Sequence, residues 1–503
     1  MSLPNVRELV CALLISAFLL VIDLSTFHLF PTPWPDDISF SEPAINLATR
    51  GALDTFVWPA QPSGTFWTAN TPLYPLILSG WIEVAGFSLF AIRSFNYLLI
   101  SIACIGVWML ALRFGICRSM WARLSLIPMI HLGYGVSFAY RSSRPDILGL
   151  LILLLYVYSL TITRTTRRRT LCTACAIAAV WTGPQLGILI GAGALLALTL
   201  GWIARTDVVA TIIGGSLGAV SFFLTLLAFD AVPNFMASVA LGRTGGIGIE
   251  IPVLMKLRKC LVAYVSDYSF VPIFSAAVCL AAAGWPAFDR QVRKQLVFLA
   301  SWISMIPWLL NFTSNYGYYY SYMLHVPACW SLVLVFDRVR FATRRPKALV
   351  GAFIGAILVG TAVGLPLRLA IALHEVDFMP RAAIATTLQN HLRATDTVLS
   401  DNATFFEVKA IAPLVFGEYY HRLGGMNVSE KASLTALVLY PKDFESVSSS
   451  VGGEWEAVGD TFGDVRLPDA GSTPPMLTKL LDRYFSSPQM IRAPLQVYRR
   501  TVR

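Results

Sequence analysis

Long apolar runs alternate with short polar turns through the first three quarters of the chain. A helix needs about 20 mainly apolar residues to cross a hydrocarbon core about 30 Å thick. Runs of that length predict eleven spans, near residues 9–30, 91–112, 119–139, 146–162, 171–186, 187–204, 208–229, 261–283, 296–312, 319–336 and 348–372. The fifth and sixth are short and are divided by Thr182-Gly183-Pro184, so the sequence leaves the count open by one.

The composition agrees with a polytopic α-helical membrane protein. Of the 503 residues, 56% are apolar and only 14% are charged, whereas a soluble domain carries about 25% charged residues. A soluble chain of this length would split into domains that have polar surfaces. These figures exclude soluble, disordered and fibrous classes of protein. The net charge of +10 must be assigned to individual loops before it can indicate a partner.

Lysine and arginine gather in alternate turns between the predicted spans, and this pattern orients the chain with its N-terminus inside. Residues 1–373 contain 26 basic and 14 acidic side chains, a net charge of +12, whereas residues 374–503 contain 13 and 15. The basicity is therefore a signal of topology and not a footprint of nucleic-acid binding. We expect a multi-pass protein of a bacterial inner membrane, with residues 374–503 on the extracytoplasmic side.

The two parts of the chain differ in their patterns. Residues 1–373 form the predicted transmembrane domain, which includes a polar first outer loop at residues 31–90. Within that loop, residues 73–84 predict an amphipathic helix at the membrane interface. Residues 374–503 have short alternating apolar stretches and helical stretches separated by Gly, Ser and Pro, which predicts a small soluble α/β domain.

Two adjacent carboxylates, Asp36 and Asp37, open the first outer loop, and Glu42 follows one or two helical turns later. One interpretation is structural, because an aspartate at the start of a helix caps free N–H groups. The other is catalytic: one carboxylate is a general base, and the second fixes its position or raises its pKa. The spacing alone leaves both interpretations open.

Several short motifs follow one another around this pair of aspartates. Residues 35–42 resemble a P-D-E-x-x-Y-x-E segment, residues 70–76 an x-x-P-P-L-Y motif, and residues 90–95 an S-x-x-A-x-R start of the second span. Arg144-Pro145-Asp146 resembles an R-x-D motif in the second outer turn. These motifs are similar to those of the GT-C-type glycosyltransferases that use polyprenyl-phosphate sugars, such as protein O-mannosyltransferases and the lipid A aminoarabinose transferase. The resemblance covers residues 9–165.

The resemblance implies roles for three carboxylates. Asp36 takes the place of the family's catalytic aspartate, Asp37 that of the acidic residue after it, and Asp146 that of a second acidic position near the acceptor and the donor phosphate. The chemistry agrees, since a sugar hydroxyl is a poor nucleophile and needs a carboxylate to accept its proton. Direct displacement at the anomeric carbon would invert its configuration without a covalent enzyme intermediate.

The departing lipid phosphate gains negative charge, so cations or N–H donors should face it. Six basic residues on the predicted outer side run against the positive-inside trend: Arg141, Arg144, Arg243, Lys256, Arg258 and Lys259. They are candidates for this contact, and the alternative is that they extend toward lipid head groups. For Arg144 a further alternative is a purely structural ion pair with Asp146. Arg243 lies in a glycine-rich stretch suited to a loop that closes over a substrate.

One position departs from the family pattern. The aminoarabinose-type enzymes carry Glu-Lys before their Pro-Pro-Leu-Tyr motif, and the lysine faces the donor phosphate. Ala69-Asn70 stands there in this chain, so the phosphate contact must come from elsewhere. Asn70 can still donate a hydrogen bond to a phosphate or a sugar hydroxyl.

Aromatic side chains crowd the start of the tenth span. Five tyrosines between residues 316 and 322 are typical of an interfacial aromatic belt. Residues 320–327 also resemble the family's R/H-Y-x-x-P-x-x-P segment, which lines the cavity. On that resemblance Tyr319, Tyr320 and His325 would stack on a sugar ring or reach the phosphate, and a histidine within an apolar span is itself a candidate for a polar site.

The resulting hypothesis is an integral-membrane, inverting glycosyltransferase. It would move a hexose or pentose from a polyprenyl-phosphate carrier to a lipid, glycan or protein acceptor on the outer face, in cell-envelope glycosylation. Paired aspartates can bind a divalent cation, although the family pattern does not demand a metal. The alternatives are a secondary transporter or lipid flippase, which usually shows repeats and charges at mid-membrane depth, and an inactive scaffold of the same fold.

Overall fold

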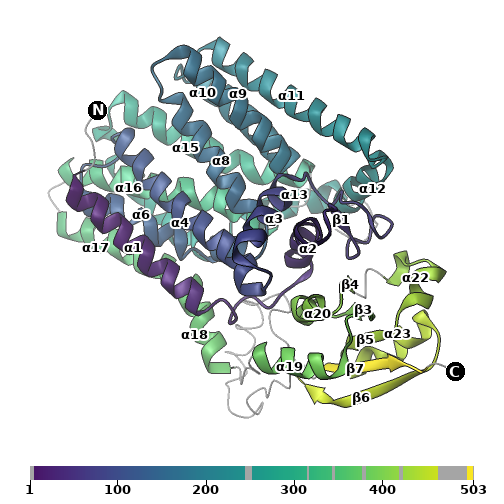
Figure 1. Ribbon diagram of the computed structural model, residues 1–503. Coiled ribbons are helices and arrows are strands. Elements are labelled where there is room, and N and C mark those ends of the chain that lie inside the picture. Colours follow the sequence, from purple (N-terminus) through teal and green to yellow (C-terminus); the bar gives the residue numbers. More distant parts are fainter. Residues whose placement is uncertain are drawn as a thin grey trace.

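The computed structural model describes residues 5–243, 252–313, 317–342, 346–375, 381–417, 423–462 and 495–501. Most of these residues belong to one helical bundle, and a small mixed sheet with its own helices lies beside one end of the bundle (Figure 1). The bundle is formed by α1 (Val6–Ser25), α4 (Leu89–Arg113), α5 (Met120–Leu124), α6 (Leu126–His131), α7 (Tyr134–Arg141), α8 (Asp146–Leu160), α9 (Thr165–Thr182), α10 (Pro184–Thr199), α11 (Arg205–Ala228), α12 (Val232–Arg243), α13 (Val253–Ala263), α14 (Phe270–Gly284), α15 (Arg290–Thr313), α16 (Tyr322–Ala342), α17 (Pro346–Ala362) and α18 (Leu365–Glu375).

The described helices confirm a protein with several apolar spans. Five helical segments are long and apolar enough to cross a membrane, or up to seven if two bent pairs each count as one span. The bends are 112° between α7 and α8 and 43° between α17 and α18. The remaining expected spans correspond to helices that are shorter, interrupted or more polar. The run at residues 119–139, expected as one span, is divided among the short helices α5, α6 and α7.

The loop expected at residues 31–90 contains two helices and a two-stranded ribbon. Helix α2 (Pro35–Arg50) begins at a proline, which suits the first helical position because its missing N–H would be unbonded there. Helix α3 (Leu73–Ala85) confirms the helix predicted at residues 73–84. Its apolar face packs on α2 and α4, and β1 (Asp54–Thr55) pairs with β2 (Thr65–Phe66) between the two helices.

The C-terminal part is an α/β unit, as its alternating pattern predicts. Its sheet has the order β4-β3-β5-β7-β6, in which β3 pairs in parallel with β4 and β5, and β7 runs antiparallel to β5 and β6. The strands are β3 (Thr397–Ser400), β4 (Leu414–Gly417), β5 (Ala436–Leu439), β6 (Trp455–Phe462) and β7 (Leu495–Arg500). The helices are α19 (Arg381–His391), α20 (Phe405–Ile411), α22 (Val428–Ser433) and α23 (Phe444–Val451).

The α/β unit is packed against the first loop. Helix α20 lies beside α2 (Figure 1), and one apolar cluster joins Ile38 and Ile45 of α2 to Phe405 and Val408 of α20. Burial of such side chains contributes about 1.5–3 kcal/mol each. The helix that carries the candidate aspartates is therefore fixed between the bundle and the C-terminal unit.

Candidate active site

Asp36 is the second residue of α2, and its side chain is 27% exposed. The guanidinium of Arg144, from the turn between α7 and α8, donates through Nη1 to its Oδ2. The same guanidinium donates through Nε to Asp146 Oδ2 at 2.7 Å. Arg144 and Asp146 are almost fully buried, with side chains 3% and 2% exposed. One cation thus joins two carboxylates, of which only Asp36 is appreciably open.

The capping interpretation does not describe these two aspartates. The N-cap position of α2 belongs to Trp34, and the Asp36 carboxylate is bonded to Arg144. The Asp37 carboxylate is fully buried, forms an ion pair with Arg93 of α4 at 2.9 Å and accepts the N–H of Ser143. Asp37 therefore joins α2 to α4 and to the turn that presents Arg144.

Burial raises the pKa of the Asp36 carboxyl above its ordinary value. Arg144 opposes this effect, whereas the negative charges of Asp146 and Asp37 add to it. A general base works best when its pKa approaches the working pH. Asp36 therefore combines access to solvent with a pKa moved in the direction that suits a base.

Aromatic rings surround the guanidinium of Arg144. Its central carbon lies 3.7 Å from the ring centroid of Tyr319, and the rings of Trp34, Phe40 and Tyr320 lie within 6 Å. Such cation–π contacts contribute about 0.5–2 kcal/mol each. They hold the guanidinium plane in place, so the direction of its N–H donors is fixed.

A small cavity adjoins this group. Its volume of about 20 Å³ has room for about one water molecule. The polar side chains that line it include Asn70, Arg144, Asp146, Thr182, Gln185 and Tyr320. Asn70 Nδ2 lies 3.5 Å from the carbonyl oxygen of Thr182, and Gln185 Nε2 lies 3.5 Å from the hydroxyl of Tyr320. The structure therefore brings together five predicted site residues, namely Asp36, Asn70, Arg144, Asp146 and Tyr320, with Tyr319 stacked beside them.

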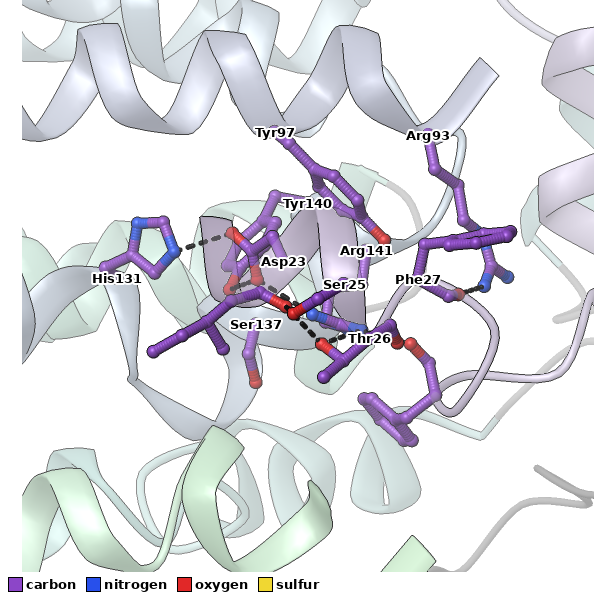
Figure 2. Close-up of polar contacts among 12 residues, drawn as sticks. Asp23, Ser25, Thr26, Phe27, Arg93, Tyr97, His131, Ser137, Tyr140 and Arg141 are labelled. Carbon is purple, nitrogen blue, oxygen red and sulfur yellow. Dashed lines mark hydrogen bonds and ion pairs between the residues drawn. The ribbon is translucent and has the colours of Figure 1, made fainter. Parts of the chain in front are cut away.

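A buried charge network holds the segment that leads into α2. Figure 2 shows Asp23, at the end of α1, between His131, Tyr140 and Arg141. Its carboxylate lies 2.7 Å from His131 Nε2 and accepts from the Tyr140 hydroxyl at 2.9 Å and from Arg141 Nη1 at 2.8 Å. The expectation that Arg141 faces a phosphate is wrong, because its side chain is fully buried in this network.

Two arginines bind the backbone between α1 and α2. Arg141 donates to the carbonyl oxygens of Thr26 and Phe30, and Arg93 donates to that of Phe27 at 2.7 Å (Figure 2). Arg141 ends α7, three residues before Arg144. The network therefore fixes the start of α2 and the Arg144 turn against each other.

The structure does not bring every predicted site residue to this place. His325 is buried in α16, where its Nε2 lies 2.9 Å from the carbonyl oxygen of Met129, and it does not line the cavity. Lys256 and Arg258 lie on α13, which packs mainly on α15. Arg243 ends α12, but its side chain lies outside the described residues. In the described part of the chain, no group of three His, Cys, Asp or Glu side chains is placed to hold a metal ion.

Sequence reasoning missed two contributors. Arg93 lies near the start of a predicted span, and its partner Asp37 is 56 residues away in the chain. Gln185 follows the break between the fifth and sixth expected spans, and nothing in its local pattern distinguishes it from other helix-start residues. The useful signal was the interruption at Thr182-Gly183-Pro184 itself, because irregular backbone at membrane depth often lines a cavity.

The chain folds as a helical bundle with a loop helix and an attached α/β unit at one end, and its structural neighbours identify this as the GT-C fold. Solved structures share it. ArnT from Cupriavidus metallidurans bound to undecaprenyl phosphate is 12% identical, with a TM-score of 0.58 over 91% of this chain and 97% of that one. The apo state of the same protein is 14% identical, with a TM-score of 0.54 over 90% and 96%.

An oligosaccharyltransferase from Archaeoglobus fulgidus in its apo form is 11% identical, with a TM-score of 0.51 over 93% of this chain and 75% of that one. No protein-family model and no curated protein matches the sequence. At such low identities the likeness shows the fold, and it confirms the fold that the sequence resemblance implies.

Proposed function

We propose that this protein transfers a sugar from a polyprenyl-phosphate carrier to an acceptor at the extracytoplasmic face of the membrane. The observation that carries the proposal is the Asp36–Arg144–Asp146 group, in which the open carboxylate has a raised pKa and a buried arginine fixes its place. The fold adds support, because one neighbour that shares it is bound to undecaprenyl phosphate and another is an oligosaccharyltransferase.

The proposed chemistry is a single inverting displacement. The acceptor hydroxyl oxygen forms a bond to the anomeric carbon while the bond from that carbon to the phosphate oxygen breaks. Asp36 takes the hydroxyl proton, because Arg144 holds its Oδ2 and leaves Oδ1 for the acceptor. The bonding electrons leave with the lipid phosphate. Arg144 stabilises the charge that develops there, and the aromatic rings beside it hold its guanidinium in place.

Asp37 acts through Asp36 in this proposal. It is buried against Arg93 and has no open face for a substrate, so it positions α2, and its negative charge helps to raise the pKa of Asp36. Asn70 and Tyr320 line the cavity and are proposed to contact the sugar or the phosphate. The transfer assay distinguishes hexose from pentose donors and tests for assistance by a divalent cation.

The test is sugar transfer by the purified protein, supplied with a panel of polyprenyl-phosphate sugars and with lipid, glycan and peptide acceptors. Asp36→Asn should reduce transfer by about 1,000-fold or more, since the amide cannot accept the proton. Its melting temperature and its membrane insertion should match the wild type, because the side chain is partly open. A fully active Asp36→Asn protein, or uptake into vesicles without any transfer, would overturn the proposal. The latter result would favour a transporter.

A further inference from the structure

A second and larger hollow lies at the other end of the bundle from Asp36. Helix α8 starts at Asp146, and its 15 residues lead about 22 Å away from the candidate site to the turn before α9. An open groove of about 520 Å³ follows the first part of α9. It is lined by Thr166, Arg169, Thr170, Thr173, Ala174 and Ile177.

The groove changes from charged to apolar along its length. Thr166, Arg169 and Thr170 lie in the first two turns of α9, and the Arg169 side chain is 44% exposed. Thr173 and Ala174 follow, and Ile177 lies furthest along. The threonine hydroxyls have backbone partners: that of Thr170 donates to Thr166 O at 3.1 Å, and that of Thr173 to Ala210 O at 3.0 Å. Their hydroxyl oxygens keep lone pairs, but Arg169 is the donor for an incoming anion.

Arg169 is held at the mouth of the groove by α11. Its Nη2 donates to the hydroxyl of Thr206 at 2.8 Å, and its Nε lies 3.8 Å from the buried carboxylate of Asp207. Arg168 binds the same carboxylate at 3.0 Å. Asp207 therefore orients two arginines while it neutralises only one positive charge.

Positive charge remains in excess around the groove. Arg164, Arg167 and Arg205 are exposed, and no described carboxylate lies within ion-pair distance of them. Residues 164–169 and 205–207 together hold five arginines and one aspartate, a net charge of +4. A local field of this strength favours a bound anion.

We propose that the groove along α9 binds an anionic phospholipid, with the phosphate at Arg169 and an acyl chain along Ala174 and Ile177. A small soluble anion would use the charged end and leave the apolar end unfilled. The face of α11 that points away from α9 is apolar as well: Val209, Ile212 and Ile213 are each about half exposed, as side chains that meet hydrocarbon are. Basic groups at the ends of membrane helices are a known means of holding lipid head groups. This site does not depend on the proposed sugar transfer.

The test is native mass spectrometry of the full-length protein titrated with phosphatidylglycerol or with phosphatidylcholine. The protein should bind phosphatidylglycerol at least fivefold more tightly than phosphatidylcholine. Arg169→Gln should lower the affinity for phosphatidylglycerol by about the same factor. Arg290→Gln is the matched control, because Arg290 is an exposed arginine at the start of α15, at the same end of the bundle, where Lys294 bonds to Leu200 O. It should leave lipid binding unchanged.

A second variant separates a lipid site from a simple anion site. Ile177→Trp fills the apolar end of the groove without changing any charge, and it should weaken the binding of phosphatidylglycerol. Equal binding of the two lipids, equal effects of Arg169→Gln and Arg290→Gln, or unchanged binding to Ile177→Trp would each overturn the proposal. Competition by millimolar inorganic phosphate would do so as well, because it would identify a site for free anions.

Discussion

The Arg144 guanidinium contacts the Asp36 carboxylate although 108 residues separate them in the chain. The contact depends on the 112° bend between α7 and α8, which turns residues 142–145 toward the start of α2. Asn96 of α4 holds this turn, because its Nδ2 donates to the carbonyl oxygens of Ser142 and Arg144 at 2.6 and 3.1 Å. The candidate site is thus assembled by backbone shape as much as by the reacting side chains.

Arg144→Gln should change the pH dependence of transfer as well as its rate. Arg144 holds the pKa of the Asp36 carboxyl down against burial and against Asp146 and Asp37, so its loss lets that pKa rise further. A base must be ionised, and the acidic limb of the kcat/KM profile should therefore move to higher pH. We also expect kcat to fall by about 100-fold, since a donor to the developing phosphate charge is lost. A variant with reduced kcat but an unmoved acidic limb would contradict the assignment of Asp36 as the base.

Asp23 should behave as a positioning residue. Asp23→Asn removes the counter-charge of Arg141, which loosens the hold of Arg141 on the Thr26 and Phe30 carbonyls. The contact between Arg144 and Asp36 should weaken in turn, so the acidic limb should shift upward and hydrogen exchange should rise in residues 31–40 and 142–146. The exchange measurement reports this loss of positioning directly, without a transfer assay.

The control for this experiment is a matched charge on the same helix. Glu8, near the other end of α1, is 3% exposed and pairs with Arg123 at 2.7 Å. Breaking a buried pair costs about 3–5 kcal/mol, so Glu8→Gln should lower the melting temperature about as much as Asp23→Asn. It should not move the acidic limb. If Asp23→Asn does not fold, Tyr140→Phe removes a single 2.9 Å hydrogen bond at a cost of about 1 kcal/mol and tests the same network.

The sequence predicts the helices and strands better than it predicts the tertiary contacts between them. Periodicity and length identified the apolar helices, the helix α3 and the α/β character of residues 374–503, because each depends on local pattern. Motif order placed Asp36 and Arg144 in one site, and the contact between them agrees. The pattern could not show that residues 119–139 break into short helices, because the same apolar composition suits one span or several.

Charge pairing was the hardest part to predict. Asp37 looked like a second member of a catalytic pair, yet its partner is Arg93, and Arg141 looked like a phosphate ligand, yet its partner is Asp23. In each case the deciding contact joins residues at least 56 apart in sequence, so no local spacing encodes it. His325 followed the family motif, but its ring bonds to a backbone carbonyl inside the bundle.

Lys409→Met should weaken the contact between the C-terminal unit and α2. Lys409 lies 3.8 Å from the buried Glu42 carboxylate, which also accepts from the Thr55 hydroxyl and the Phe56 N–H. Removing the cation leaves Glu42 buried without a counter-charge and should cost about 3 kcal/mol. Hydrogen exchange should increase in α20 and α2, and Glu42→Gln/Lys409→Met should recover most of the loss.

The same variant should respond to pH in a defined direction. Burial raises the pKa of the Glu42 carboxyl, and Lys409 opposes the rise, so Lys409→Met should raise that pKa further. Protonation at low pH then removes the unpaired charge. The destabilisation should accordingly be largest above neutral pH and shrink as the pH falls. Equal exchange in Lys409→Met and wild type at every pH would show that the ion pair does not hold the two units together.

Asp401 should make the C-terminal sheet less stable as the pH rises. Burial at the end of β3 raises the pKa of its carboxyl from 3.8 to about 6, with Asp443 adding to the rise and the N–H of Ala403, at 2.8 Å, and Tyr440 opposing it. The folded state therefore holds the proton more tightly than the unfolded chain. This contribution to stability is fully present below about pH 4 and is lost as the pH rises through 6, by about 3 kcal/mol. Asp401→Asn keeps the acceptor but never ionises, so exchange-derived opening free energies for β3 and β5 should lose this pH dependence. Glu445 is exposed, so the control variant Glu445→Gln should retain this pH dependence.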